Sequence, residues 1–279
     1  MKSSRQGAAA RSAAAATPST ENTAKAARGR AARAGTGTAD APRQSRRGRP
    51  RKTQRKESAQ DRILDAAEEL LARHGFYGVT IRQVAQHAGV DTALLHYYYG
   101  SKRGLFDAVF GRRAQILNQL RMESLDRYES EAGDNMTIEG VTDAFIRPLI
   151  DMATEGGPGW RNYFALVAQV NNAPVWGGAT MTRYFDPVIH RFIGLLRKLL
   201  PDTPPEDIYW CFQQLTGAIT LTLSQTGRID RLSGGLCRSS DLRAAYARMV
   251  PYAAGGLRAV CEAAANRAKA SAPRRSSSK

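Results

Sequence analysis

The sequence predicts an all-α protein in which a small three-helix head precedes a larger helical bundle. Apolar residues recur at helical spacing through most of residues 58–265. From about Arg112 onward, no stretch alternates between apolar and polar residues as a half-buried strand does. Nearer the start, two short helical patterns are separated by a glycine. Together these three observations favour helices packed on helices.

The first helix is expected over residues 58–73. Its apolar positions share one face, and its acidic residues point away from that face. The apolar positions are Ile63, Leu64, Ala67, Leu70 and Leu71. Gly75 is expected to end this helix, because glycine readily adopts backbone conformations outside the helical region.

The segment TIRQVAQHAGVDTALLHYYYGSK, residues 80–102, holds the next two helices. Thr80 with Gln83 three residues later is a capping-box start, and Gly89 suits the left-handed residue that ends a helix. Asp91 is placed to cap the second helix. Two helices joined through a glycine turn form a helix-turn-helix, whose second helix fits the major groove of DNA. The pattern alone also fits an ordinary helical hairpin inside a core.

A longer helix is expected to follow, with Ser101 as its cap. Its apolar stripe comprises Leu105, Val109, Phe110, Ile116, Leu117 and Leu120. Three short helices, a tyrosine-rich segment and this longer helix together resemble the DNA-binding domain of the TetR family of bacterial repressors. The resemblance spans residues 61–109, and the run AGVDTALLHYYYGSK carries it most specifically.

The resemblance implies that residues 91–98 form the helix that enters the major groove. Thr92 and Ala93, at its start, would reach base edges. Tyr97 and His96 would contact DNA near its far end, although the family most often has tyrosine where His96 stands, which puts that contact in doubt. Tyr98 fits packing as well as binding.

Three residues outside this helix are also expected at DNA. In the family, the lysine at the position of Lys102 pairs with a backbone phosphate, although a lone surface lysine is usually only solvated. Thr80 and Arg82 lie at the start of the supporting helix, where N–H groups can face a phosphate.

Positive charge is concentrated at the two ends of the chain. The whole sequence has 41 basic and 25 acidic residues, a formal net charge of +16. Residues 1–57 hold 15 Lys or Arg and three acidic residues, and residues 266–279 hold five basic residues and no acid. Both segments are poor in apolar groups and are expected to be disordered, which leaves a nearly neutral folded body.

Within the first tail, RRGRPRK at residues 46–52 resembles the AT-hook, an extended arm that lays two arginines in a narrow A·T minor groove. Arg47 and Arg49 would make that contact. The alternative is a generic basic tail that binds any polyanion through counterion release. In either case the tail is expected to raise affinity for DNA and to make it fall steeply with salt.

Five further helices are expected in the remainder. They span residues 137–154, 159–171, 181–200, 205–228 and 240–265. The sequence therefore predicts four segments. These are a basic tail over 1–57, the helix-turn-helix domain over 58–110, a helical domain over 111–265 and a second basic tail over 266–279. The resemblance implies that the helical domain binds a small effector and forms a dimer.

The middle helices carry large apolar side chains that suit either an effector pocket or plain core packing. They are Met152, Trp160, Tyr163, Phe164, Val167, Trp176, Met181, Phe185 and Ile189. Pro148 and Pro187 interrupt helical stretches, where a kink would help to open a cavity. The segments PPEDIYWCF to TGAI and MVPYAAGGLRAV resemble, more weakly, regulators that respond to fatty acids. This second resemblance implies a hydrophobic effector of aliphatic or acyl type.

The last two helices are poor in charge on one face. The resemblance implies that they pair with their symmetry mates in a homodimer. The dimer would place two reading helices roughly 34–36 Å apart on a pseudo-palindrome. The residues expected at this interface are Leu215, Ile219, Leu223, Met249, Ala253 and Leu257. Packing within one chain is the alternative.

The sequence lacks the patterns typical of enzymes, metal sites and membrane proteins. Its three cysteines and four histidines have no ligand spacing, and no apolar run is long enough to span a bilayer. No nucleophile elbow, phosphate loop or paired-carboxylate motif occurs. We therefore expect no enzyme activity and no cofactor, and a location in the bacterial cytoplasm in association with the nucleoid.

Two functions from different classes fit these observations. The first is a ligand-gated transcriptional repressor that leaves a palindromic operator when an effector binds, and the same residues also fit an activator. The second is an architectural DNA-coating protein, whose basic tails do most of the binding while the helical body only dimerises.

Overall fold

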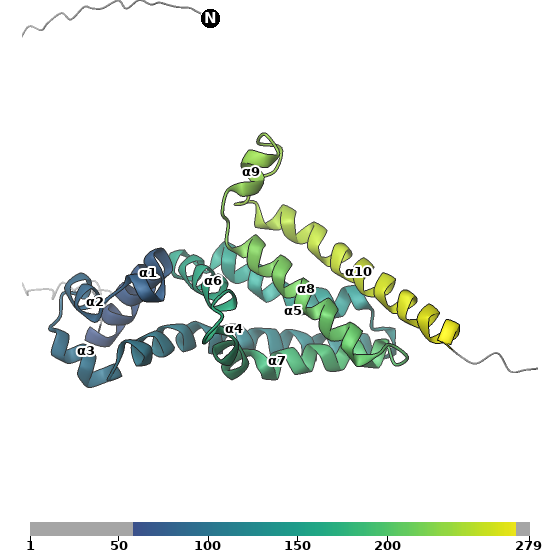
Figure 1. Ribbon diagram of the computed structural model, residues 1–279, viewed down its shortest axis with the longest axis horizontal. Helices are drawn as coiled ribbons and strands as arrows, with labels where there is room; N and C mark the ends of the chain where they lie inside the picture. The colour runs from purple at the N-terminus through teal and green to yellow at the C-terminus, as the bar shows by residue number, and fades with distance from the viewer. Residues whose placement is uncertain (1–57, 272–279) are drawn as a thin grey trace, which may run out of the picture. The chain divides into compact units, whose positions relative to one another are not determined.

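The computed structural model describes residues 58–271, and over these residues the chain is all-α, which confirms the predicted fold class (Figure 1). The head comprises α1 (Ala59–Gly78), α2 (Ile81–Ala88) and α3 (Thr92–Tyr99), and α4 (Lys102–Ala132) leads out of it. After a short 3-10 turn at Gly133–Asn135 come α5 (Ile138–Glu155), α6 (Pro158–Asn171), α7 (Gly177–Leu199), α8 (Pro205–Leu223), α9 (Arg228–Leu232) and α10 (Leu242–Ser271).

The local signals in the head are realised as the sequence predicts. The Thr80 hydroxyl accepts a hydrogen bond from the Gln83 backbone N–H, and the Gln83 side chain returns to the Thr80 backbone, so the capping box is complete. Gly89 ends α2 in the left-handed region with φ 64°. The Asp91 carboxylate accepts from the Ala93 N–H at 2.7 Å and so caps α3. These caps fix where both helices of the helix-turn-helix begin.

The first helix differs from its prediction at one point. Gly75 does break the regular backbone, with φ 73° and ψ 168°, but a further helical turn follows and α1 continues to Gly78. Phe76 in this added turn packs edge-on against Phe106 of α4, with ring centroids 5.5 Å apart. The extra turn is therefore held by tertiary packing rather than by local preference.

α4 runs through the expected boundary between residues 110 and 111. It is a continuous helix of 31 residues, and it packs on α1 and α3 in the head and on α5 and α7 in the bundle. Its buried side includes Val109, Leu117 and Leu125, whereas Ile116 is exposed, against expectation. The head and the bundle thus share one continuous helix, α4.

The bundle is built from α5, α7, α8 and α10, and α6 lies between it and the head (Figure 1). The rings of Phe145 on α5 and Phe192 on α7 stack at its centre with centroids 4.1 Å apart. α5 and α7 continue through Pro148 and Pro187, so the two prolines do not end these helices.

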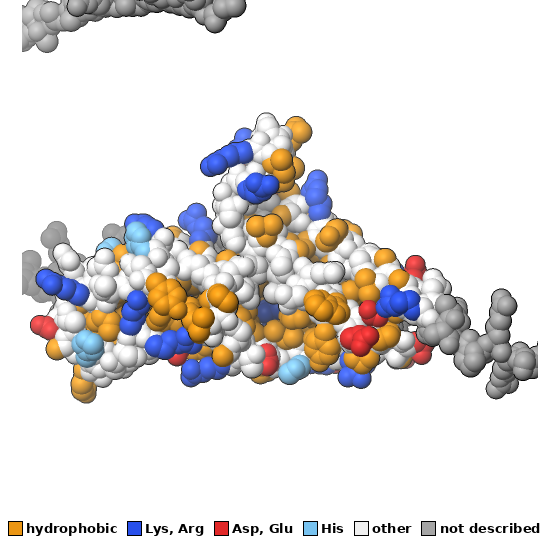
Figure 2. All heavy atoms as spheres, in the orientation of Figure 1, with side chains coloured by type: hydrophobic (Ala, Val, Ile, Leu, Met, Phe, Trp, Pro, Cys, Tyr) orange, Lys and Arg blue, Asp and Glu red, His pale blue; other side chains and the backbone are white. Residues whose placement is uncertain are grey.

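α9 is a short helix that the sequence did not predict. The expected helix over 205–228 ends at Leu223, and Gln225 then takes a positive φ of 46°. α9 stands clear of the other helices in Figure 1. Figure 2 shows hydrophobic and basic side chains next to each other on this projecting segment, where Leu236 is 91% exposed. α10 begins two residues later than expected and runs on to Ser271.

Candidate nucleic-acid interface and ligand cavity

α3 is held in the head by one side and leaves the other side free. Leu95 is 1% exposed and sits in the head core, and Leu94 and Tyr99 are half-buried beside it. Among the described elements, α3 packs mainly on α2 and α4. Its outer side carries exposed Ala93, His96 and Tyr97, with Tyr97 81% exposed. A helix mounted this way can enter a groove without moving its support.

The start of α3 combines a half-buried threonine with a small exposed residue. Thr92 is half-buried and Ala93 is exposed directly after the Asp91 cap. On the neighbouring helix start, the Thr80 hydroxyl also donates to the Gln83 side chain at 2.9 Å, so it is engaged within the protein. Arg82 is exposed beside it. Of these two supporting residues, Arg82 has the side chain better placed to reach a phosphate.

At the far end of α3, two predicted contacts have partners inside the protein. A ring nitrogen of His96, Nδ1, lies 3.3 Å from the Gly100 carbonyl oxygen. Lys102 Nζ lies 4.6 Å from the centroid of the Phe76 ring, a cation–π arrangement that positions the ammonium at the start of α4. The expected minor-groove arginines, Arg47 and Arg49, lie outside the described residues.

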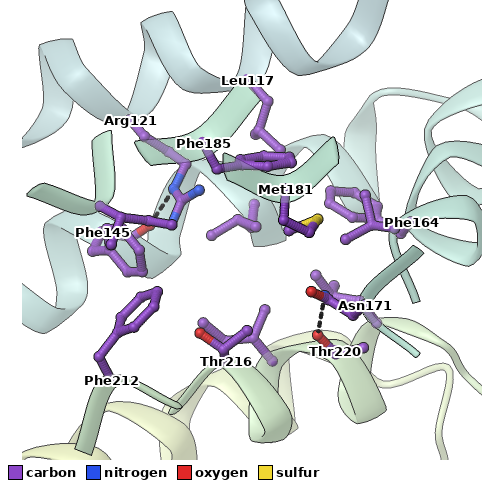
Figure 3. A pocket seen from close by; sticks show the side chains of 15 residues that line it. Leu117, Arg121, Phe145, Phe164, Asn171, Met181, Phe185, Phe212, Thr216 and Thr220 are labelled. Carbon is purple, nitrogen blue, oxygen red and sulfur yellow. Dashed lines mark hydrogen bonds between the residues drawn. The ribbon is translucent and has the colours of Figure 1, made fainter. Parts of the chain in front are cut away.

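A cavity of about 60 Å³ lies in the bundle among α4, α5, α6, α7 and α8. Figure 3 shows side chains from all these helices converging on it. Its walls are mostly aliphatic and aromatic, and its polar groups are few. The lining residues are Leu117, Arg121, Phe145, Leu149, Phe164, Val167, Asn171, Met181, Phe185, Ile189, Phe212, Thr216, Ile219, Thr220 and Leu223.

Of the nine residues considered for an effector pocket, five line this cavity: Phe164, Val167, Met181, Phe185 and Ile189. Four lie elsewhere. Trp160 and Tyr163 occupy another face of α6, where Tyr163 packs against Phe110 with centroids 5.5 Å apart. Trp176 packs on Phe106 at 5.2 Å. Met152 is half-buried against the core away from the cavity.

Arg121 is the charged residue among the cavity-lining residues that the sequence did not predict. It is 5% exposed, its Nε donates to the Phe145 carbonyl at 3.3 Å, and its guanidinium lies 3.7 Å from the Phe145 ring centroid. Burial lowers its pKa to about 9, so it remains protonated at neutral pH. Its spacing was the available signal, because Arg121 stands four residues after Leu117 and four before Leu125 on the buried stripe of α4.

α6 connects the cavity to the head. Phe164, Val167 and Asn171 on α6 line the cavity. On the same helix, Gln169 Nε2 donates to the Ala72 carbonyl of α1 at 2.9 Å. A shift of α6 that accompanies a change in the cavity would therefore act directly on the first helix of the head.

The structure places the expected dimer residues inside a single chain. Leu215, Ile219, Leu223, Met249 and Leu257 are buried and Ala253 is half-buried. The cause is that α8 packs on α6, α7 and α10, while α10 also covers α5. This side of the two helices is consequently unavailable to a partner, and packing within one chain accounts for its apolar stripe.

The opposite side of the same helices is open. On α8 it carries Trp210, 66% exposed, together with exposed Gly217 and Leu221. On α10 it carries exposed Tyr252 and Gly256. A Cβ added at Gly217 or Gly256 would meet no atom of the chain within 4 Å. This outer face combines large apolar anchors with small residues that permit close approach of another helix.

Comparison with known families agrees with the geometry of the head and of the bundle. Residues 63–109 match the profile described as bacterial regulatory proteins, tetR family, and residues 143–256 match the tetracyclin repressor-like C-terminal domain. Together the two profiles match more than half of the chain. The chain belongs to the TetR family of helix-turn-helix regulators.

Curated relatives match mainly over short segments. The chain is 50% identical over 48 residues to the HTH-type transcriptional regulatory protein RaaS of Mycobacterium tuberculosis, covering 17% of this chain and 22% of that protein. It is 28% identical over 97 residues to the HTH-type transcriptional repressor NicS of Pseudomonas putida, covering 34% and 46%. The chain thus spans less than half the length of these relatives.

Solved structures with a similar arrangement include a TetR-like transcriptional regulator from Rhodococcus sp. RHA1. It has a TM-score of 0.48 and 18% identity, covering 72% of this chain and 96% of that one. The regulator FadR from Bacillus subtilis in complex with stearoyl-CoA has a TM-score of 0.47 and 15% identity, covering 70% and 97%. Within residues 58–271, no helix has the length and apolar character needed to cross a membrane.

Proposed function

We propose that this protein is a sequence-specific DNA-binding transcriptional regulator, most simply a repressor that a small hydrophobic effector releases from a palindromic operator. The observation that carries the proposal is the exposed side of α3, with Tyr97 81% exposed on a helix anchored by buried Leu95. Family membership supports DNA binding, and similarity to the Pseudomonas repressor NicS supports repression rather than activation.

The reading surface in this proposal comprises Ala93 and Thr92 at the start of α3 and Tyr97 farther along it. Neither Ala nor Thr makes the bidentate base contacts of Arg or Asn, so each should contribute modestly to sequence preference. Arg82 and Lys102 flank the helix and would contact phosphates, which fixes the register of α3 on the duplex. Thr80 and His96 would contribute less to DNA binding, because their polar atoms already have hydrogen-bond partners within the protein.

The effector site in this proposal is the cavity among α4 to α8. Its apolar lining supports a hydrophobic ligand, and the weak resemblance to fatty-acid-responsive regulators supports an acyl group. A space of about 60 Å³ is small beside the several hundred Å³ of a typical ligand pocket. Binding would therefore displace lining helices, and a ligand that favours the displaced state shifts the equilibrium by its differential affinity, typically about 1–3 kcal/mol.

The proposal also includes a homodimer formed through the outer face of α8 and α10. A palindromic operator requires two reading helices related by a twofold axis. The outer face provides exposed Trp210, Leu221 and Tyr252 around small residues, as expected of a helix–helix interface.

Footprinting on the DNA upstream of the protein's own gene tests the proposal. One protected site made of two half-sites about 10 base pairs apart, lost in Tyr97→Ala, is the expected result. Diffuse protection that Tyr97→Ala leaves unchanged would contradict it and would favour the architectural alternative.

A further inference from the structure

Arg121 is a buried cation in the wall of the cavity, and no acidic residue in the described part of the chain pairs with it. Its side chain comes from α4 and is 5% exposed. Among the residues that the structure describes, no carboxylate lies within ion-pair distance of its guanidinium, although many other arginines of the fold have such a partner. Within residues 58–271 its side chain donates one hydrogen bond, from Nε to the Phe145 carbonyl.

A buried charge in this state is costly unless something compensates it. Here the Phe145 carbonyl and the face of the Phe145 ring compensate only in part. The two terminal nitrogens of the guanidinium donate to no acceptor in the described part of the chain. Figure 3 shows the guanidinium turned from α4 toward the cavity, with Phe145 and Phe185 beside it. A planar pair of N–H groups that faces the cavity and has no acceptor among the described residues is the geometry that binds a carboxylate through two parallel hydrogen bonds.

A second buried polar group, on α6, interacts electrostatically with Arg121. The Tyr163 hydroxyl on α6 is fully buried and lacks a hydrogen-bond partner within residues 58–271. Burial raises the pKa of Tyr163, and the positive charge of Arg121 acts in the opposite direction, so the two groups interact electrostatically. Tyr163 does not line the cavity, so among these two groups only Arg121 can contact a ligand there.

We infer that the effector is an amphiphile with a single negative charge, a monocarboxylate whose head group binds Arg121 and whose apolar part lies against Leu117, Met181 and Phe185. This inference rests on the proposed function, because it assigns the chemistry of the effector which that function requires. In this arrangement Arg121 forms the polar end of a cavity whose lining is otherwise mostly apolar.

The number of charged residues in the cavity lining indicates a head group with a single negative charge. Arg121 is the only charged residue among those that line the cavity. A phosphate monoester or a coenzyme A group carries two or more negative charges and would leave charge unneutralised at this depth. The remaining polar lining is neutral and lies across the cavity from Arg121, where Asn171 donates to the Thr220 hydroxyl at 3.0 Å (Figure 3). A single carboxylate matches the one cation.

The test measures binding of matched ligands to the full-length protein by isothermal titration calorimetry. The ligands are straight-chain carboxylates from butanoate to hexadecanoate, with the alcohol and the amine of each length. Wild-type protein is expected to bind the carboxylate about 10- to 100-fold more tightly than the alcohol, the range that a charged hydrogen-bonded pair supplies. The amine is expected to bind most weakly.

Two variants assign this preference to Arg121. Arg121→Met keeps most of the side-chain volume and is expected to remove the preference for the carboxylate while retaining affinity for the alcohol. Arg121→Lys is expected to restore part of the preference. Arg197→Met, which removes an exposed arginine of α7, is the matched control and is expected to bind both ligands as wild type does.

Equal binding of carboxylate and alcohol by the wild type would overturn the inference, and this comparison needs no variant to fold. If both ligands also release operator DNA, the proposed function stands without the anionic head group. Absence of binding by every ligand would overturn the inference as well, and the footprint would then decide separately whether the DNA-binding function holds.

Discussion

Glu68 of α1 and Arg113 of α4 form an ion pair with two hydrogen bonds, from Nε to Oε2 at 2.6 Å and from Nη2 to Oε1 at 2.9 Å. Glu68 is buried, and Arg112 donates to it as well, at 2.9 Å. On its other side, the Arg113 guanidinium lies 5.2 Å from the ring centroid of Trp160 at the start of α6. A Cβ on Gly159 would fall 1.9 Å from Arg113 Nη2, so α6 approaches this pair closely.

This pair is where the head, α4 and the cavity helix α6 meet. α4 carries Arg113 and, two turns farther on, the cavity residue Arg121. α6 carries Trp160 and the cavity residue Phe164. A ligand that separates α4 from α6 would disturb the contacts of Arg113, and through Glu68 it would disturb α1. We propose this as the route that couples the cavity to DNA binding.

Glu68→Gln is expected to lower the free energy of unfolding by about 2 kcal/mol. Removing one partner of a buried pair costs about 3–5 kcal/mol, and the partial exposure of both arginines reduces that value. Urea denaturation measures this change in the free energy of unfolding. Arg73→Met, which removes an exposed i,i+4 pair with Glu69, is the control and should change the unfolding energy by less than about 0.5 kcal/mol. Equal changes in unfolding free energy for the two variants would show that the buried ion pair contributes no more to stability than the exposed pair.

Tyr97→Ala and Lys102→Ala are each expected to weaken operator binding by about 1–3 kcal/mol without unfolding the head. Tyr77→Ala is the matched control, because Tyr77 is also a head tyrosine and is 78% exposed but does not belong to α3. Fluorescence anisotropy with labelled operator DNA measures the affinities. If all three variants bound as wild type does, the assignment of Tyr97 and Lys102 would fail.

Trp210→Glu and Gly217→Leu are expected to convert the proposed dimer into monomers. Neither change meets the interior of the chain, because Trp210 is exposed and a Cβ on Gly217 has free space. Val175→Glu alters another exposed apolar residue and should leave the dimer intact. Sedimentation velocity distinguishes the species. Dimers that persist in both outer-face variants would place the interface elsewhere.

Acid should remove the contribution of Glu129 to stability. Hydrogen bonds from Arg191 and Lys198 hold the pKa of Glu129 below its ordinary value. The unfolded chain then takes up more protons as the pH falls, so the stabilisation is present above the ordinary glutamate pKa and disappears below the folded value. Glu129 and Arg191 are half-buried and Lys198 is exposed, so solvent screens the pairs and the effect should stay below about 1 kcal/mol.

The measurement is the difference in unfolding free energy between wild type and Glu129→Gln, at pH 7 and at pH 3. We expect a positive difference at pH 7 that is smaller at pH 3. Glu131→Gln changes an exposed neighbour outside the described ion pairs and should show no such dependence. A difference that grows on acidification would have the wrong sign for this mechanism.

The head could be predicted in detail because its determinants are local. The capping box at Thr80, the left-handed Gly89 and the Asp91 cap depend on residues at most three positions apart, and all three are found. The extra turn after Gly75 could not be predicted in this way, since packing between Phe76 and Phe106 holds it.

The cavity and the dimer face show the limit of pattern reading. An apolar stripe predicts that a helix face is buried, but not whether its own chain or a partner buries it. Leu215 and Met249 lie on such stripes and are covered within one chain. Arg121 was missed because a charged residue is normally assigned to the surface, and only the three-dimensional structure shows that its side chain ends in a cavity.

We propose that α3, rather than the basic tail, selects the DNA sequence. The decisive measurement is the ratio of affinities for operator and scrambled DNA across a salt series. We predict that a protein lacking residues 1–57 keeps this ratio and shows a flatter salt dependence, because 15 basic residues are removed. Full-length Tyr97→Ala should lose much of the ratio and keep most of the salt dependence. Loss of the affinity ratio on deleting the tail, with the ratio unchanged in Tyr97→Ala, would show instead that the tail selects the sequence.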